Sequence, residues 1–335
     1  MDNKEQEYFI NQKPSFWEKK LTEKEYQALV EAGTDSAFDN KYYHHQKKGI
    51  YVCAACRNVL FSSADKYDSG SGWPSFSDLI FSDSIGTRAD NKLAQERTEV
   101  FCARCGGHLG HIFSDGPQPT GLRYCINYSS LTFLKQGYLA QGCFWGPDAS
   151  YGALDGVYFT ASGYAGGDKK DPSYHNLGNH TETVRISYDP EQISWSDLLD
   201  IYWESHNPNS RAASKQYSSI IFVNDSHQEK TVQKFLDKKK EITAKEVYTT
   251  TQKLDKFHEA EDYHQNYVFS QDLNLKQFRK SLLNAGERLT YSRLLTKLNA
   301  YSQGELEKKK MIEELEDSYL KVKKPELIAE IKNKL

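Results

Sequence analysis

The sequence predicts two domains of different classes: a small, mainly-β domain followed by an α/β domain (an α+β two-layer sandwich) with a helical C-terminal tail. Between about residues 48 and 134, short apolar or aromatic runs alternate with Gly, Ser, Asp and Pro clusters, which is typical of a compact all-β unit. After Phe133, strand-like and helix-like runs alternate instead, which favours an α/β or α+β domain. Beyond residue 272 the chain is rich in Leu, Lys and Glu, a composition that predicts helix.

Local signals place the main elements. Residues 14–33 are expected to be helical, because Thr22 and Glu25 have the spacing of a capping box. In the second half we expect strands at 138–142, 183–188 and 219–223 and helices beginning near Phe144, around 194–205 and after Ser226, the last with Ser226 as its N-cap. The boundary near 135 is expected to be tight, since no Gly- or Pro-rich linker stands there.

The tail from 272 to 335 has two interpretations. Residues 304–335 hold eight Lys and eight Asp or Glu, so this segment is balanced in charge. It can be an amphipathic helix that packs back on its own domain, or a helix that docks a partner or a second copy of the chain.

Composition restricts the partners and the compartment. A net charge of −3 over 335 residues gives no basic surface for nucleic acid. The first residues lack the pattern of a signal peptide, and no apolar run has the length of a membrane span. All six cysteines lie before residue 144, a distribution that fits reduced thiols better than a disulfide framework. We therefore expect a soluble, cytoplasmic protein that binds neither nucleic acid nor membrane.

Two C-x-x-C pairs predict a structural zinc site. Cys53 and Cys56 form the first pair and Cys102 and Cys105 the second. Two such turns can converge on one Zn²⁺ and supply four thiolates, which completes a tetrahedral site. One pair could instead be a redox dithiol, but that predicts a single motif at the start of a helix. With four thiolates available, the nearby histidines are not needed as ligands.

A fifth cysteine, Cys125, stands in a polar and aromatic setting. A lone thiol is usually an inert core residue, but Arg123 and Asn127 lie two positions away on the same face of an extended segment. A cation there can favour the thiolate. His108, His111 and Asp115 precede this segment and could supply protons.

These residues carry a family resemblance over residues 14–135. GSGWPSF (70–76), GGHLGHIFSDGPQPTGLRYCIN (106–127) and the two C-x-x-C pairs resemble the B-type, R-stereospecific methionine sulfoxide reductases. The resemblance implies that Cys125 is the nucleophile and that Trp73 packs against the substrate methyl group. It also implies that His108 and His111 bind the sulfoxide oxygen or its water, supported by Asp115, Arg123 and Asn127. Many relatives carry a resolving cysteine where this chain has Ser71.

The sixth cysteine, Cys143, stands in the sequence GCFWG, where a strand is expected to enter a helix. Backbone N–H groups and the helix dipole at such a turn are expected to lower the pKa of the thiol. Phe144 and Trp145 offer an apolar wall that can hold a methyl-sulfur group. On its own, the motif could equally be a core Phe-Trp pair beside a buried cysteine.

Further motifs extend a second resemblance over residues 137–271. GCFWG, GYAGG (163–167), HTETV (180–184), QY (216–217) and AEDYHQNY (260–267) resemble the A-type, S-stereospecific methionine sulfoxide reductases. By this resemblance Cys143 is the nucleophile, Phe144 and Trp145 form the methyl pocket, and Glu182 protonates the sulfoxide oxygen with help from Tyr164 and Tyr217. The stretch before Tyr217 is short here: the expected acidic residue falls on Ala212, and Asn179 replaces a common glycine.

Together the two resemblances imply a bifunctional enzyme that repairs methionine sulfoxide in oxidised proteins through cysteine sulfenic acid intermediates. If zinc takes four thiols, only Cys125 and Cys143 remain, and neither domain keeps a resolving cysteine. We expect a thioredoxin-like or other external thiol to reduce each sulfenic acid directly. Exchange between Cys125 and Cys143 is the alternative. Two other classes are a zinc-ribbon interaction module, which explains only the C-x-x-C pairs, and a general thiol oxidoreductase or peroxidase.

Overall fold

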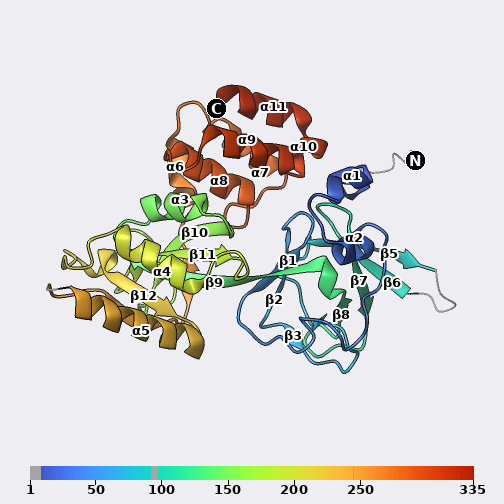
Figure 1. The fold of residues 1–335 in the computed structure, drawn as a ribbon, viewed down its shortest axis with the longest axis horizontal. Coiled ribbons are helices and arrows are strands. Elements are labelled where there is room, and N and C mark those ends of the chain that lie inside the picture. The colour runs from blue at the N-terminus through green and yellow to red at the C-terminus, as the bar shows by residue number, and fades with distance from the viewer. Residues whose placement is uncertain (1–8, 92–96, 244) are drawn as a thin grey trace. The chain divides into compact units, whose positions relative to one another are not determined.

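The computed structural model describes residues 9–91, 97–243 and 245–335, and the chain divides into two compact units between Leu134 and Lys135 (Figure 1). Ser318–Pro325 belongs to the first unit and Glu326–Leu335 to the second. Within the described ranges, every helix is too short or too polar to cross a bilayer.

The first unit begins with short helices. A 3-10 turn (Phe9–Asn11) precedes α1 (Pro14–Trp17) and α2 (Glu23–Leu29). The predicted capping box is confirmed: the Glu25 N–H donates to the Thr22 hydroxyl, and the Glu25 carboxylate accepts from the Thr22 backbone N–H at 2.8 Å. The two residues thereby satisfy N–H groups that a helix start leaves without partners.

Two antiparallel sheets form the body of the first unit, so the mainly-β prediction is confirmed. In the smaller sheet, β1 (Ile50–Cys53) pairs with β2 (Val59–Ser62) and with the first residues of β9 (Leu131–Gln141). The larger sheet has the order β3-β4-β8-β7-β6-β5. Its strands are β3 (Lys66–Tyr67), β4 (Ser75–Phe76), β5 (Ile85–Asp90), β6 (Arg97–Cys102), β7 (His108–Phe113) and β8 (Arg123–Ile126).

A mixed sheet forms the centre of the second unit, with the order β13-β12-β9-β11-β10-β14. The second part of β9 pairs with β11 and β12, so no linker separates the two halves of the chain. Only β12 and β13 run parallel among the described pairs. The remaining strands are β10 (Val157–Ala165), β11 (Thr181–Tyr188), β12 (Ser219–Val223), β13 (Thr250–Lys253) and β14 (Phe257–Glu259).

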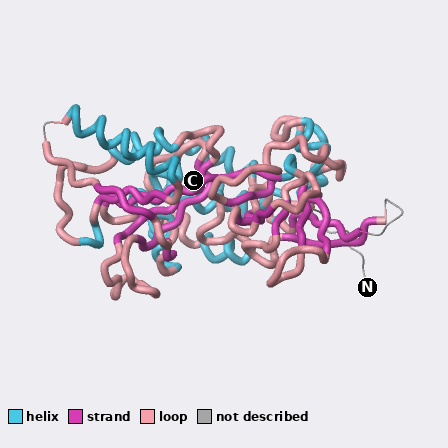
Figure 2. Tube along the Cα trace, turned by 90° about the horizontal axis from the view of Figure 1, so that it is seen from below, coloured by secondary structure: helices cyan, strands magenta, loops and turns pink. Residues whose placement is uncertain are grey.

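Helices lie beside this sheet, as the cyan and magenta segments of Figure 2 show. They include α3 (Trp145–Ala153), α4 (Trp195–Glu204) and α5 (Ser226–Ile242). The predicted cap at Ser226 is wrong, because the Asp225 carboxylate accepts the N–H groups of His227 and Gln228. Asp225 is extended and stands one residue earlier, which puts its side chain in reach of the free N–H groups of the first turn.

The C-terminal part is helical, as predicted. It contains α6 (Tyr267–Gln271), α7 (Phe278–Asn284), α8 (Arg293–Ser302), α9 (Lys308–Asp317), α10 (Leu320–Lys323) and α11 (Pro325–Lys334). Of these, α8 packs against α3 and α6. The helical segment is therefore folded back on its own unit at this point, and a purely solvated helix is excluded for α8.

Candidate active sites

Four cysteines converge in the first unit. Cys53 ends β1 and Cys102 ends β6, and each C-x-x-C turn continues from its strand. Their four sulfur atoms all lie within 4.8 Å of one another. The Sγ atoms of Cys53 and Cys105 are 3.7 Å apart, and those of Cys56 and Cys102 are 3.6 Å apart. A tetrahedral ion with Zn–S bonds of about 2.3 Å requires sulfur separations of about 3.8 Å, so the donor set fits zinc.

The two turns share one backbone geometry. The N–H of Arg57 donates to the Cys53 carbonyl at 2.9 Å, and that of Gly106 donates to the Cys102 carbonyl at 2.8 Å. Arg57 and Gly106 both have positive φ, 59° and 83°. The Gly107 N–H also donates to Cys105 Sγ at 3.4 Å. Turns of this shape direct both sulfurs and further N–H groups to one point, which favours thiolates there.

Cys125 lies in the middle of the larger sheet. On β8 it is paired with His111 of β7 on one side and with Ser75 of β4 on the other. The Ser71 hydroxyl oxygen is 3.8 Å from Cys125 Sγ. A pocket of about 100 Å³ opens beside the sulfur, and its lining is Thr34, Trp73, Arg97, Gly110, His111, Phe113, Cys125, Ile126 and Asn127.

Burial decides the pKa of the Cys125 thiol. Burial raises this pKa above its ordinary value, and the Ser71 hydroxyl and the Arg123 guanidinium only partly offset the effect. The expected contribution of Arg123 is therefore present, but it does not dominate.

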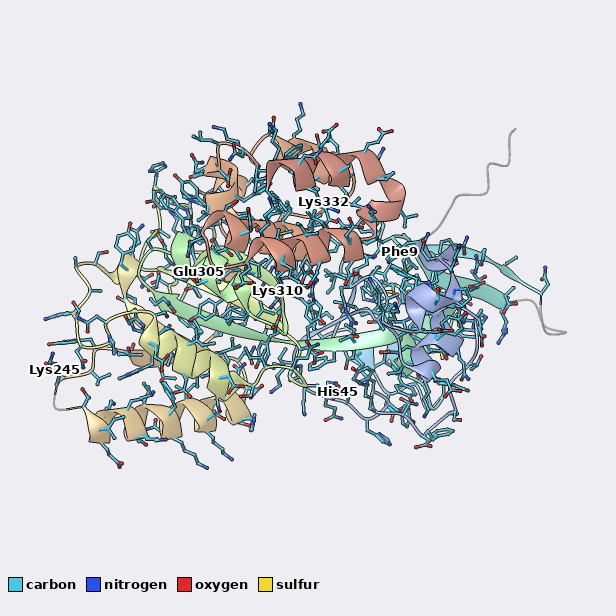
Figure 3. The ribbon with its side chains drawn as sticks, turned by 45° about the horizontal axis from the view of Figure 1, so that its top comes forward. Phe9, His45, Lys245, Glu305, Lys310 and Lys332 are labelled. Carbon is cyan, nitrogen blue, oxygen red and sulfur yellow. The ribbon has the colours of Figure 1, made fainter. Side chains whose placement is uncertain are left out.

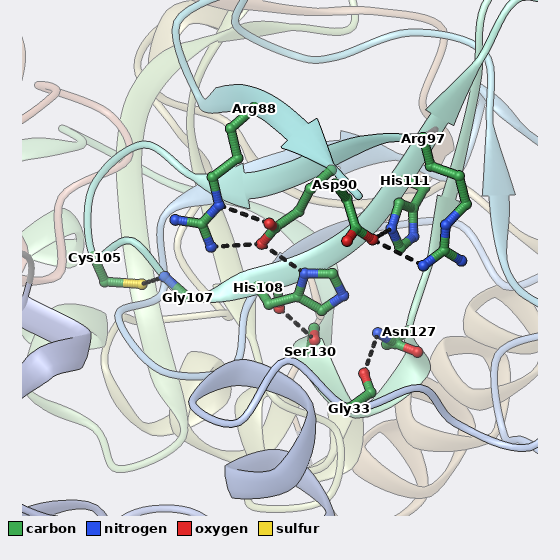
Figure 4. A network of polar contacts seen from close by, with 11 residues as sticks. Gly33, Arg88, Asp90, Arg97, Cys105, Gly107, His108, His111, Asn127 and Ser130 are labelled. Atoms are coloured by element: carbon green, nitrogen blue, oxygen red, sulfur yellow. Dashed lines mark hydrogen bonds and ion pairs between the residues drawn. The ribbon is translucent and has the colours of Figure 1, made fainter. Parts of the chain in front are cut away.

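Each of the two predicted histidines is held by a buried carboxylate (Figure 4). His108 Nδ1 lies 2.8 Å from Glu99 Oε1, and His111 Nε2 lies 2.7 Å from Asp90 Oδ2. Arg97 Nη2 donates to the same Asp90 oxygen at 2.8 Å. The two rings are 5.5 Å apart between centroids. A carboxylate on one ring nitrogen fixes the ring orientation and leaves the other nitrogen for a ligand.

The electrostatics of these pairs differ. Burial alone would raise the pKa of Glu99, but hydrogen bonds from His108 and Arg88 outweigh it and lower this pKa to about 2. Arg88 donates hydrogen bonds to both Glu99 oxygens, at 2.6 and 2.7 Å. For His111, burial lowers the pKa and the Asp90 contact only partly restores it.

The three supporting residues of the prediction take different positions. Arg123 donates two hydrogen bonds to the exposed Asp115 carboxylate, at 2.8 and 2.9 Å. The Asn127 side chain accepts from the Asp35 N–H at 2.9 Å and donates to the Gly33 carbonyl at 3.1 Å. Asn127 thus lines the pocket while its amide holds the 33–35 loop.

The same loop fixes Trp73. Its indole N–H donates to the Asp35 carbonyl at 2.9 Å. This bond holds the ring in the wall of the Cys125 pocket. Neither this contact nor that of Asn127 could be foreseen, because the loop is distant in sequence from both residues.

Cys143 lies where the sequence places it, between the end of β9 and the start of α3. Gly142 has φ of +97°, a turn conformation that glycine adopts without strain. The expected low pKa of Cys143 is wrong. Partial burial raises the thiol pKa, and so does the Glu182 charge, while the Trp145 N–H lowers it only in part. The helix-start N–H group acts as expected, but desolvation is the larger effect.

Glu182 connects the turn to the sheet. It lies on β11 with 1 % of its surface exposed. Its Oε2 accepts from the Phe144 N–H at 3.1 Å, and its Oε1 accepts from Gln216 Nε2 at 2.7 Å. Burial raises the pKa of Glu182 despite these bonds. A carboxyl group held beside a thiol and biased toward its protonated form is suited to donate a proton.

Aromatic residues surround the thiol turn. Trp145 stacks on Tyr267, with the ring centroids 3.7 Å apart and the planes inclined by 7°. Its indole N–H donates to His264 Nδ1 at 3.1 Å. Phe144 is buried and lies 5.9 Å from the Tyr164 ring. Together these rings form a wall able to hold an apolar group.

The two predicted tyrosines are placed differently. Tyr164 is buried, and its hydroxyl donates to Glu261 Oε2 at 2.8 Å. Tyr217 is 37 % exposed, and its hydroxyl accepts from Gln216 Nε2 at 3.4 Å. A hydrogen bond with Tyr174, followed by burial, raises the pKa of Tyr217 to about 12.

Gln216 and Glu261 contact the predicted site residues, although the sequence did not single them out. Both lie inside motifs that the sequence made visible, QY and AEDYHQNY. Their roles follow only from contacts over long distances in the chain, 34 residues to Glu182 and 97 residues to Tyr164. No acid stands at Ala212, and the carboxylate that meets Tyr164 comes from a different segment.

Comparison with known proteins assigns both halves of the chain. Residues 21–135 match the SelR domain, and residues 135–290 match the family described as peptide methionine sulfoxide reductase. A Leptospira interrogans protein, peptide methionine sulfoxide reductase MsrB, is 52% identical over 129 residues, which are 38% of this chain and 98% of that relative. The mouse methionine-R-sulfoxide reductase B3, mitochondrial, is 52% identical over 115 residues, 34% of this chain and 46% of that relative.

Two solved structures resemble part of the chain. Reduced Mxr1 from Saccharomyces cerevisiae shows 25% identity and a TM-score of 0.40, covering 42% of this chain and 87% of that one. Methionine sulfoxide reductase A of Corynebacterium diphtheriae shows 26% identity and a TM-score of 0.37, covering 42% and 76%. The two family matches and the relatives confirm both resemblances found in the sequence. The chain belongs to the peptide methionine sulfoxide reductases, with a B-type domain followed by an A-type domain.

Proposed function

We propose that Cys125 and Cys143 are the two nucleophiles of this methionine sulfoxide reductase, Cys125 for the R epimer and Cys143 for the S epimer. The observation that carries the proposal is that each sulfur has both a proton-donating group and an aromatic wall beside it. The domains that we assign to them are residues 14–135 and 137–271, with 272–335 as the helical extension.

The same reaction would occur at both sites. The thiolate attacks the sulfoxide sulfur and forms a transient S–S bond with it, while a proton reaches the sulfoxide oxygen. The oxygen then passes to the cysteine sulfur: a Cys S–O bond forms as the substrate S–O bond and the transient S–S bond break. Methionine leaves, and the oxygen stays on the cysteine as a sulfenic acid. Methionine gains two electrons, and the cysteine sulfur loses them.

At the first site, Trp73 would hold the substrate methyl group against Cys125. His108 and His111 would bind the sulfoxide oxygen or its water. Support for this comes from their carboxylate partners, which fix both rings before substrate arrives. Arg123, with Asp115 as its partner, would favour the Cys125 thiolate, and Asn127 would keep the pocket loop in place.

At the second site, Glu182 would protonate the sulfoxide oxygen. Its raised pKa supports this, since a protonated carboxyl group is the donor that the step needs. Tyr164 and Tyr217 would assist with their hydroxyl groups, and Phe144 and Trp145 would form the methyl pocket. The missing acid at 212 is compatible with this assignment, because Gln216 holds Glu182 and Glu261 holds Tyr164.

Regeneration would need an external reductant. If the cluster thiols hold zinc, no third free thiol remains beside Cys125 or Cys143. A thioredoxin-like protein or another small thiol would therefore attack each sulfenic acid, release water and leave as a disulfide after a second thiol reacts. Mass spectrometry after sulfoxide treatment without reductant tests this step. A Cys125–Cys143 disulfide would contradict direct reduction.

Zinc would be structural. Cys53, Cys56, Cys102 and Cys105 would hold it, and the sulfur spacing supports this ion. The ion would stabilise a small β unit and take no part in the chemistry. That none of the six cysteines is paired in a disulfide also supports our proposal of a cytoplasmic location, where thiols stay reduced.

An assay on separated epimers tests the whole proposal. Cys125→Ser should abolish reduction of the R epimer only, and Cys143→Ser that of the S epimer only. If neither variant loses an activity, the assignment is wrong. Activity on disulfides or peroxide without epimer preference would favour a general thiol oxidoreductase instead.

A further inference from the structure

A helix beyond the two matched ranges is built into the second unit. The matched residues end at 290, and α8 begins at Arg293. Seven consecutive residues of α8, Leu294–Ala300, are buried, including the polar Thr296, Lys297 and Asn299. Polar side chains are buried at this density only when they have partners. Their partners show what α8 contributes.

The Asn299 amide joins two other helices. Its Oδ1 accepts from the Phe269 backbone N–H of α6 at 3.0 Å, and its Nδ2 donates to Asp148 Oδ2 of α3 at 2.9 Å. A backbone N–H can only donate, so it fixes which end of the amide faces α6. The amide nitrogen must then face Asp148. Asn299 has no exposed surface, and neither has Asp148.

Both helices carry parts of the Cys143 site. Asp148 lies in the first turn of α3, whose first residue is Trp145. The first residue of α6 is Tyr267, and its ring stacks on the Trp145 ring at 3.7 Å. The distance between α3 and α6 therefore sets this stacking. Asn299, on a third helix, hydrogen-bonds to both of them.

Other residues of the C-terminal segment hold α3 along its length. Lys297 Nζ donates to the carbonyls of Gly152 and Leu154, at 2.8 and 2.9 Å, at the C-terminal end of α3. A cation at that end also interacts favourably with the negative end of the helix dipole. Gln303 Nε2 donates to the Gly146 carbonyl at 3.2 Å, in the first turn. The start and the end of α3 are therefore both held by polar contacts from α8 and the residue after it.

Two surface residues of the C-terminal part, Glu305 and Lys310, which Figure 3 labels, also contact α3 or the residues just after it. Glu305 accepts from the Ser150 hydroxyl at 3.3 Å, and Lys310 pairs with Asp155 at 2.5 Å. Surface pairs of this kind contribute little to stability. The buried Asn299 contact is the one that removal would disturb, because it would leave the Phe269 N–H and the Asp148 carboxyl group without that partner.

We propose that Asn299 is a positioning residue for the S-epimer site, which sets the Trp145 wall through Asp148 on α3 and Phe269 on α6. Helix α8, which lies beyond the matched residues, then helps to shape the A-type site. This inference rests on the proposed role of Cys143 and Trp145. It predicts that substrate binding at the second site depends on a side chain that touches no substrate.

The test uses the full-length chain and both epimers of free methionine sulfoxide, with dithiothreitol as reductant. Asn299→Ala should raise KM for the S epimer roughly 10-fold, since a misplaced wall weakens binding of the methyl group. Reduction of the R epimer in the same preparation should be unchanged. The methionine released from the S epimer in a single turnover without reductant counts the functional second sites, so kcat per site can be compared. A structural role alone would lower the number of sites and leave KM unchanged.

A reciprocal pair of variants tests the hydrogen-bond pattern. Asn299→Asp keeps the shape and the acceptor for the Phe269 N–H, but it places an oxygen against Asp148, and KM should rise as in Asn299→Ala. Adding Asp148→Asn puts an amide donor on the other side and should restore KM to within about twofold. Asn333→Ala, at an exposed position of α11, is the control and should behave as wild type.

The outcomes separate the two proposals. Wild-type KM in folded Asn299→Ala would overturn the positioning role, and so would failure of the reciprocal pair to restore KM. Equal loss on both epimers would also overturn it, because the effect would then not belong to the second site. A wild-type chain that does not reduce the S epimer would overturn the proposed function itself.

Discussion

The Ser71 hydroxyl lies 3.8 Å from the Cys125 sulfur. Ser71 occupies the place where many relatives carry a resolving cysteine, and the structure shows that a thiol there would face the proposed nucleophile. A disulfide bond is about 2.05 Å long, so a sulfur at position 71 would need to move by less than about 2 Å. The B-type domain therefore keeps the proximity that an internal disulfide requires, although the residue at position 71 is not a thiol.

Ser71→Cys should give the B-type domain its own resolving thiol for the Cys125 sulfenic acid. After one turnover with the R epimer and no reductant, we expect a disulfide between the introduced thiol and Cys125, because the new thiol is close enough to attack the sulfenic acid. Mass spectrometry of the digested protein measures it. Ser69→Cys is the matched control: the Ser69 hydroxyl contacts those of Ser71 and Ser75, at 2.8 and 2.7 Å, whereas the hydroxyl that contacts Cys125 Sγ is that of Ser71. A disulfide from both variants, or from neither, would contradict the geometric argument.

Glu182→Gln should separate proton donation from substrate binding in the A-type domain. We expect kcat for the S epimer to fall by about 10²- to 10⁴-fold, the range of general acid catalysis, with little change for the R epimer. The amide keeps an oxygen for the Phe144 N–H, so the fold should be preserved. Unchanged kcat would exclude Glu182 as the acid.

The pH dependence of the same variant has a definite sign. Burial raises the pKa of Glu182, so the protonated donor persists to higher pH than for an ordinary carboxyl group. The rate advantage of the wild type over Glu182→Gln should be largest below this raised pKa. It should shrink as the pH rises through it, because the donor is then lost. A ratio that does not change with pH would show that Glu182 acts without transferring a proton.

Much of the site follows from local sequence, and the rest depends on long-range packing. The Thr22–Glu25 capping box and the C-x-x-C turns involve residues within a few positions, so their spacing predicts their structure. The Asp225 cap shows the limit of this reasoning: Asp225 and Ser226 are both good capping residues, and only the backbone conformation selects Asp225.

Electrostatics and distant partners were harder to predict. The raised pKa of Cys143 comes first from burial, which no local motif reveals. Glu261 meets Tyr164 across 97 residues, and Asn299 meets Asp148 across 151. The sequence places each of these residues on an element, but the tertiary packing decides which element lies beside it.

Removal of the metal should affect the activity and stability of the B-type domain only. With zinc chelated under reducing conditions, or in Cys102→Ser, we expect loss of R-epimer reduction and of the first unit's cooperative thermal transition, since the ion would supply folding free energy. Cys102 ends β6, the strand that also carries Glu99. S-epimer reduction should persist. One zinc per chain by elemental analysis is the matching observation, and full R-epimer activity without metal would contradict the structural role.

Glu99→Gln should misplace His108 in the first head. The Glu99 carboxylate lies 2.8 Å from His108 Nδ1 and also accepts hydrogen bonds from two guanidinium nitrogens of Arg88. A neutral amide cannot replace this charge-assisted network. We expect kcat/KM for the R epimer to fall roughly 10-fold, about 1.4 kcal/mol of transition-state stabilisation, with the S epimer unaffected.

The stability of Glu99→Gln should also depend on pH with a known sign. The pKa of Glu99 is lowered to about 2 in the folded protein, against about 4.3 in an unfolded chain. The charged carboxylate therefore stabilises the fold fully above about pH 4.3, and this contribution is lost as the pH falls toward about 2. The Tm difference between wild type and variant should be largest near neutral pH and should vanish on acidification. A constant difference would mean that the substitution acts through packing and not through the charge of Glu99.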